Sequence, residues 1–148
     1  MIRSGIMEVS DLRRRIRAAI EAARVRAVDR RARTDSATRA YEPFLEAIGV
    51  PAFHTLANAL VGEGHRFKVT TPGQAVRLTA ERSAEDFIEM ALDTDRDVPA
   101  VVLVAQRGRG RRMVSAERIL RAGPDIASLT EEEVVSALIE ELLLLIER

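Results

Sequence analysis

The chain has 148 residues, of which 47% are hydrophobic, 31% charged and 3% aromatic, and its formal net charge is zero. This length fits one domain, because domains average about 150 residues, and the balance of apolar and charged residues disfavours both a disordered chain and a membrane protein. The absence of cysteine excludes disulfides, thiolate metal sites and a cysteine nucleophile.

The amino-terminal residues carry no apolar run of the kind that a signal peptide requires. We therefore expect a cytoplasmic protein with no membrane partner. Arginine is far more frequent than lysine, which occurs only at Lys68. This excess of arginine indicates a GC-rich bacterial genome.

The neutral total hides a strong segregation of charge along the sequence. Residues 1–40 carry a net charge of +6, residues 41–106 of −5, residues 107–121 of +5 and residues 122–148 of −6. This alternation favours electrostatic pairing within the chain or between copies over one basic face presented to a polyanion.

A long helix is predicted over residues 8–40, which contain no proline or glycine and are rich in Ala and Arg. Its apolar residues follow the spacing of a packed helix or coiled coil: Val9, Leu12, Ile16, Ala19 and Ala23. Arg26 and Arg30 then fall on the same seam, so the strict repeat ends there. Such a helix either packs closely on another helix or projects, and residues 1–7 before it are expected to be flexible.

We expect the first helix to be broken at Pro43 and at Gly49-Val50-Pro51, and a second helix to follow over residues 51–61. From Phe67 onward apolar and polar residues alternate, which is the period of a strand. Residues 67–71 and 76–80 form a predicted hairpin around Pro72-Gly73. Further along the chain we predict a strand, with a helix as the alternative, at 83–94, a buried strand at 100–105, a turn at 107–112 and a strand or short helix at 113–120.

The last predicted helix begins at Thr130, where Glu133 completes a capping box, and runs to the carboxyl terminus. Its apolar surface is wider than one buried stripe, which predicts a contact on a second side. The candidate interaction residues are Leu138, Leu142, Leu143 and Leu144. The fold class is α+β: a long helix, a second helix, an antiparallel meander of four or five strands and a C-terminal helix packed on the sheet, as one domain over residues 8–148.

Asp93, Asp95 and Asp97 are weak candidates for a cation site, because Ca²⁺ and Mg²⁺ prefer oxygen ligands. The EF-hand pattern fails, since Val98 replaces its glycine and Val104 replaces its final glutamate. We expect a solvated acidic loop, with no metal and no cofactor.

Two basic segments are candidates for binding phosphate or a nucleic acid. One is the turn with Arg107, Arg109, Arg111 and Arg112, and the other is the first helix with Arg13, Arg14 and Arg17. The competing interpretation is a solvated hairpin turn and a helix whose arginines pair with Glu21, Asp29 or the C-terminal glutamates.

These observations favour a non-enzymatic, self-associating interaction or adaptor protein, a homo-oligomer that associates through the first helix, the last helix or both. A nucleic-acid-binding protein that uses the two basic segments is the alternative. A small metal- or phosphate-dependent enzyme built on the three aspartates is the third hypothesis.

Overall fold

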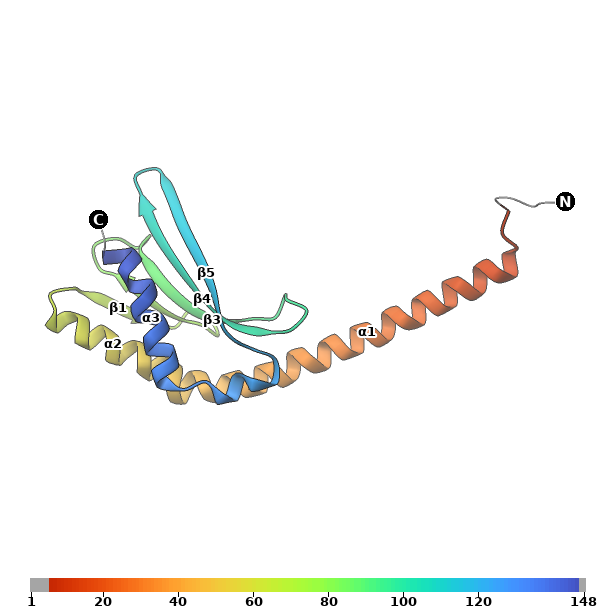
Figure 1. Cartoon of the computed structure of the whole chain (residues 1–148), viewed down its shortest axis with the longest axis horizontal. Helices are drawn as coiled ribbons and strands as arrows, with labels where there is room; N and C mark the ends of the chain where they lie inside the picture. The colour runs from red at the N-terminus through yellow and green to blue at the C-terminus, as the bar shows by residue number, and fades with distance from the viewer. Residues whose placement is uncertain (1–5, 147–148) are drawn as a thin grey trace.

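The computed structural model describes residues 6–146, and Figure 1 shows a long helix that extends away from a body of sheet and helices. The elements in chain order are α1 (Val9–Phe44), the π-helical turn η1 (Leu45–Gly49), α2 (Val50–Gly62), β1 (Phe67–Thr70), β2 (Val76–Ala80), β3 (Phe87–Asp93), β4 (Ala100–Arg109), β5 (Arg112–Ala122), the 3-10 helix η2 (Gly123–Ser128) and α3 (Glu131–Ile146). The predicted α+β arrangement is confirmed. Most of the segment 1–7, predicted to be flexible, lies outside the described residues.

The first two predicted helices are one continuous helix, so the predicted break between them is wrong. Pro43 lies inside α1, although proline removes a backbone hydrogen bond and its ring clashes with the preceding turn. The helix continues through it and then widens to the π-helical turn η1, which is a frequent way to absorb a local irregularity. Tyr41, Phe44 and Phe53 lie in the core on both sides of this turn, and their packing stabilises the helix against the proline.

The five strands form a meander with the order β1-β2-β3-β4-β5, in which every neighbouring pair is antiparallel. The hairpin at Pro72-Gly73 is confirmed: Ala75 N donates to Pro72 O at 3.1 Å, and Gly73 has a positive φ of 60°. The ambiguous segment 83–94 contains the strand β3, as predicted. β5 is likewise a strand, which excludes the short helix considered for residues 113–120.

The basic turn between β4 and β5 is shorter than the predicted 107–112. The ladder continues to the pair Arg109↔Arg112, so Arg107 and Gly108 belong to β4 and only Gly110 and Arg111 form the turn. Gly110 has a φ of 61°, which glycine adopts without steric cost.

One face of the sheet is covered by α2 and α3, and Tyr41, near the end of α1, donates a hydrogen bond to Met90 O of β3 at 3.5 Å. The core lies between these helices and the sheet, and its largest fully buried side chains include Tyr41, Phe53, Leu78, Ile88, Met90, Leu103, Leu138 and Leu145. Residues that alternate with the core positions face the other side of the sheet. There the guanidinium of Arg77 lies 4.1 Å from the ring centroid of Phe87 and pairs with Glu89 at 2.8 Å.

Both ends of α3 are anchored by side chains. At its start Glu133 N donates to Thr130 Oγ1 at 3.2 Å and Thr130 N donates to Glu133 Oε1 at 3.3 Å, which confirms the predicted capping box. At its end Arg107 Nη1 donates to Leu144 O at 2.9 Å and Arg82 Nη2 donates to Leu145 O at 2.7 Å. These carbonyls belong to the last turn of α3 within the described residues, and the end of a helix favours hydrogen-bond donors and cations.

Tyr41, the only tyrosine, supports a prediction at high pH. Burial, and secondarily the nearby negative charge of Glu89, raises the pKa of its hydroxyl far above its ordinary value. The unfolded chain releases this proton from about pH 10, while the folded chain retains it, so the free energy of unfolding should fall as pH rises above about 10 and be unaffected by this group below it. Tyrosinate absorbance should therefore appear together with the loss of far-UV ellipticity. A titration that is complete while the fold is intact would contradict the burial of Tyr41.

Candidate interaction surface

The free half of α1, residues 9–33, extends beyond the body of the protein (Figure 1). Its large apolar side chains are exposed by between 46% and 69% and recur at a spacing of three or four residues: Val9, Leu12, Ile16 and Ile20. Ala23 and Ala27 continue this line toward the body, and we call the six residues the α1 stripe. At 3.6 residues per turn they lie on one side of the helix.

The α1 stripe is in line with residues that build the core. After an interruption at Arg30, the same line continues through Thr34 to Ala37 and Tyr41, of which the last two are buried against the body. One side of a single helix is therefore part of the core at its C-terminal end and faces solvent over its N-terminal half. A second surface packed along this side would extend the core without any change in the helix.

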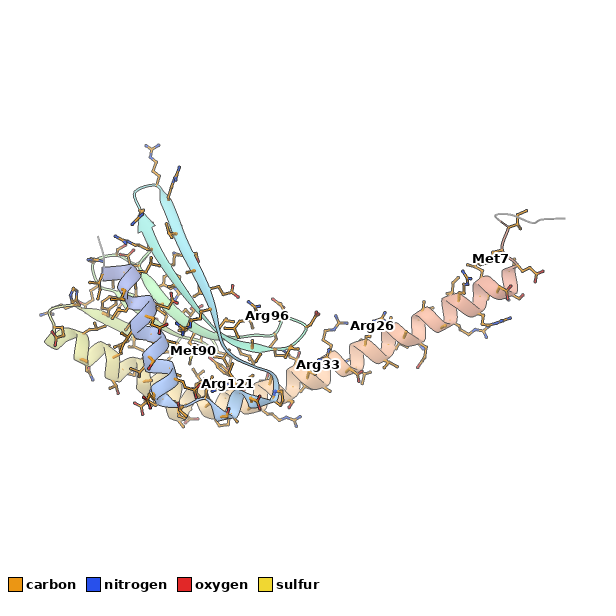
Figure 2. The ribbon with its side chains drawn as sticks, in the orientation of Figure 1. Met7, Arg26, Arg33, Met90, Arg96 and Arg121 are labelled. Carbon is orange, nitrogen blue, oxygen red and sulfur yellow. The ribbon has the colours of Figure 1, made fainter. Side chains whose placement is uncertain are left out.

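Arginines border the α1 stripe on both sides. One border of the stripe carries Arg13, Arg24 and Arg31. The other border carries Arg15, Arg26 and Arg33. Within each set the spacing is eleven and then seven residues, which is about three and two helical turns. Figure 2 shows two members of one set, Arg26 and Arg33, on α1.

Within the described residues, no arginine of α1 pairs with Glu21, Asp29 or the C-terminal glutamates, the acids predicted for this role. Arg14 and Asp11 are 3.2 Å apart, and this is the one ion pair of α1 within the described residues. The glutamates of α3 contact β5 instead: Glu133 pairs with Arg121 and Glu140 with Arg118 (Figure 2 shows Arg121 beside α3). The C-terminal acidic cluster is thus partly neutralised by Arg118 and Arg121 of β5, and not by the first helix.

The four leucines predicted for interaction occupy different environments on α3. Leu138 and Leu142 are buried in the core, and Leu144 is half-buried against it. Leu143 is exposed by 60%, and Ile139, which sequence reasoning missed, is exposed by 48%. Glu132, Ser136, Ile139 and Leu143 lie in one line along the exposed side of α3, and we call these four residues the α3 ridge. A groove of about 380 Å³ runs beside it, with Leu120 of β5 and Leu129 in its lining.

The basic hairpin is divided between a structural and an exposed part. Arg107 holds the end of α3, so its guanidinium is occupied. Arg109, Arg111 and Arg112 are exposed at the tip of the hairpin. Figure 1 shows this tip and the free half of α1 extending from the body in different directions, so the two basic segments do not form one continuous face.

The acidic loop after β3 is held by its own arginine. Asp93 accepts a hydrogen bond from Asp95 N at 3.0 Å and from Arg96 Nε at 2.9 Å, and Arg96 also contacts Glu117 of β5. Asp95 and Asp97 are exposed. Over residues 6–146, no group of three or more His, Cys, Asp or Glu side chains is placed to hold a metal ion.

Another groove, of about 540 Å³ and mainly apolar, lies where α1 joins the body. Small residues line it, from α1 and from the loops before β4 and after β5: Ala32, Ser36, Ala40, Pro99, Gly123 and Pro124. The whole helix Val9–Gly62 is long and apolar enough by composition to cross a membrane, a criterion that core helices also meet. The apolar part of this helix includes Phe44, Phe53 and Leu56, which are buried in the core.

The chain matches no protein-family model, and no curated protein or solved structure is significantly similar to it.

Proposed function

We propose that this chain is a non-enzymatic interaction protein that self-associates, and that the free half of α1 is its docking element. One observation carries the proposal: the α1 stripe is exposed, although it is in line with side chains that are buried in the core. Transfer of apolar surface from water contributes about 25 cal/mol per Å². Covering this stripe with a partner surface would therefore stabilise an assembly.

The stability of the helix itself supports the same proposal. A helix that packs on nothing is marginal in water, because each turn gains little beyond the cost of ordering the backbone. The free half of α1 consists mainly of Ala and Arg, both good helix formers, which keeps it helical before a partner arrives. A preformed helix loses less conformational entropy on binding than a disordered segment would.

Self-association is tested by the mass in solution. We expect light scattering at micromolar concentration to give a mass above the 16.4 kDa of one chain. The double change Ile16→Asp and Ile20→Asp should weaken the assembly at least about tenfold, because it places two charges in an apolar contact. A wild-type mass of 16.4 kDa at all concentrations would refute self-association.

The same helix offers a matched control for this test. Val25 and Val28 are exposed by 51% and 55%, close to the values of the stripe, but they lie off its line. Val25→Asp with Val28→Asp introduces the same charge into the same helix. If this control variant dissociates as readily as the stripe variant, then net charge, and not the α1 stripe, controls the assembly.

Nucleic-acid binding is the second candidate function, and the arginines of α1 that lack an ion pair within the described residues favour it. Affinity should fall as salt rises, because bound arginines release counterions from the phosphates. Replacing Arg13, Arg14 and Arg17 with Gln should lower affinity for unrelated sequences alike and make the salt dependence shallower. Replacing Arg109, Arg111 and Arg112 tests the hairpin separately. Fluorescence anisotropy over a salt series measures both, and no salt-dependent binding at low salt would exclude this candidate.

A further inference from the structure

The arginines beside the α1 stripe restrict what can cover it. When two identical helices pair in parallel, the residues on one border of a helix face the residues on the opposite border of its partner. When they pair antiparallel, the residues on one border face those on the same border of the partner. Both borders carry arginines, represented by Arg13 and Arg24 on one side and Arg15 and Arg26 on the other. Two copies of α1 would therefore bring arginines together in either orientation, and like charges at such positions destabilise a helix pair. The covering surface should combine apolar side chains with acids.

The α3 ridge has this combination. Ile139 and Leu143 provide exposed apolar side chains, and Glu132 lies on the same side of the helix. The side chain of Glu140, next to Ile139 in the chain, is 64% exposed even though it contacts Arg118. The segment 122–148 that contains the ridge has a net charge of −6, against +6 for residues 1–40.

We propose that the α1 stripe of one copy packs along the α3 ridge of a second copy. Leu12, Ile16 and Ile20 then contact Ile139 and Leu143, and the bordering arginines lie beside Glu132 and Glu140. This inference rests on the self-association proposed above and specifies which surfaces meet. The contact is between different surfaces, so it builds either a closed pair in which each copy gives one helix and receives one, or a head-to-tail chain.

The lengths of the two helices fit this arrangement. The free half of α1 extends for about 37 Å and α3 for about 24 Å, at 1.5 Å per residue. The free half is thus long enough to cover the whole of α3 and still bridge the space between the two bodies.

Two other exposed surfaces with apolar side chains fit the stripe less well. The groove at the base of α1 includes Arg33 in its lining and no acid. In the acidic loop Asp93 is already paired with Arg96. The exposed apolar residue of this loop is Val98. Of these three surfaces, the α3 ridge is therefore the one whose charge and apolar side chains both complement the α1 stripe.

The test uses full-length variants and their masses from sedimentation velocity over a concentration series. The stripe variant carries Ile16→Asp and Ile20→Asp, and the ridge variant carries Ile139→Asp and Leu143→Asp. We expect each to raise the dissociation constant at least tenfold, while Val25→Asp with Val28→Asp leaves it within twofold of wild type. Added salt should weaken the wild-type assembly, because the bordering charges are exposed.

Mixing the two variants gives the decisive result. A mixed pair contains one undamaged contact, between α1 of the ridge variant and α3 of the stripe variant. We expect the mixture to form pairs that neither variant forms alone. A ridge variant that assembles like wild type, or a mixture that stays monomeric, overturns this inference and leaves self-association standing. A wild-type protein that is monomeric throughout overturns both.

Folding of the ridge variant has its own control. Its circular dichroism and melting temperature should match those of the wild-type monomer, because both positions are exposed. If it unfolds, the milder pair Ile139→Ser and Leu143→Ser replaces it in the mixing experiment, with the same expected outcomes.

Discussion

Replacing Leu138 with alanine should lower the free energy of unfolding by about 2 to 5 kcal/mol, whereas Leu143→Ala should lower it by less than about 0.5 kcal/mol. The two leucines lie on the same helix, five residues apart, but Leu138 is fully buried and Leu143 is 60% exposed. Truncation at Leu138 removes buried methyl groups and leaves a cavity, while truncation at Leu143 removes groups that water already surrounds.

Urea denaturation followed by circular dichroism measures both changes. The measurements belong at a concentration low enough for the wild-type protein to be monomeric, because association would add to the apparent stability. Equal effects at the two positions would mean that α3 packs with a different side toward the sheet. Under the proposed assembly, Leu143→Ala instead changes the concentration dependence of the mass.

Gly49→Val should lower the free energy of unfolding by about 1 to 3 kcal/mol, even though valine has the higher helix propensity. A Cβ atom at Gly49 would lie 2.7 Å from Met90 Cε and 3.3 Å from Leu45 Cδ1. Met90 is fully buried in the core, so its terminal methyl group can move aside only if its neighbours also move. Glycine at this position lets the helix approach the sheet.

Gly62 provides the matched control, because it also lies in a helix and a Cβ there would meet no atom within 4 Å. Thermal unfolding should show Gly62→Val close to wild type and Gly49→Val clearly less stable. In a Met90→Ala background the cost of Gly49→Val should shrink, since the clashing atoms are gone. An unchanged cost in that background would assign the loss to the backbone of the π-helical turn.

The elements that local rules determine were predictable from the sequence. Thr130 and Glu133 form the predicted capping box, and the turn at Pro72-Gly73 joins two strands as expected. Residues 83–94 could be assigned to a strand only through their neighbours, because their apolar residues fit either period. Pairing with β2 and β4 on both sides resolved this ambiguity.

The continuous helix could not be predicted, because local rules place a break at Pro43 and again at Gly49. Packing of aromatic side chains on both sides of the turn outweighs the proline, and Gly49 serves a close contact with the sheet and not the end of a helix. The roles of Leu138 and Leu143 were equally hidden, since both are leucines in a helix whose apolar residues form more than one stripe. Exposure of the α1 stripe was beyond the sequence too, because a stripe buried in a body has the same spacing.

The order of the strands also bears on how fast the protein folds. Every strand of the sheet pairs with its neighbour in the chain, so each new pairing closes only a short loop. The entropy lost on closing a loop grows with its length, and folding rates fall as contacts become more distant in sequence. The meander can therefore form hairpin by hairpin, with few competing pairings. We expect α3 to dock after it, since Arg107 of β4 and Arg82 of the turn between β2 and β3 hold the last turn of α3. The apolar side of the sheet stays open to water until α3 docks, so fast pairing of the strands brings forward the moment at which it can be covered.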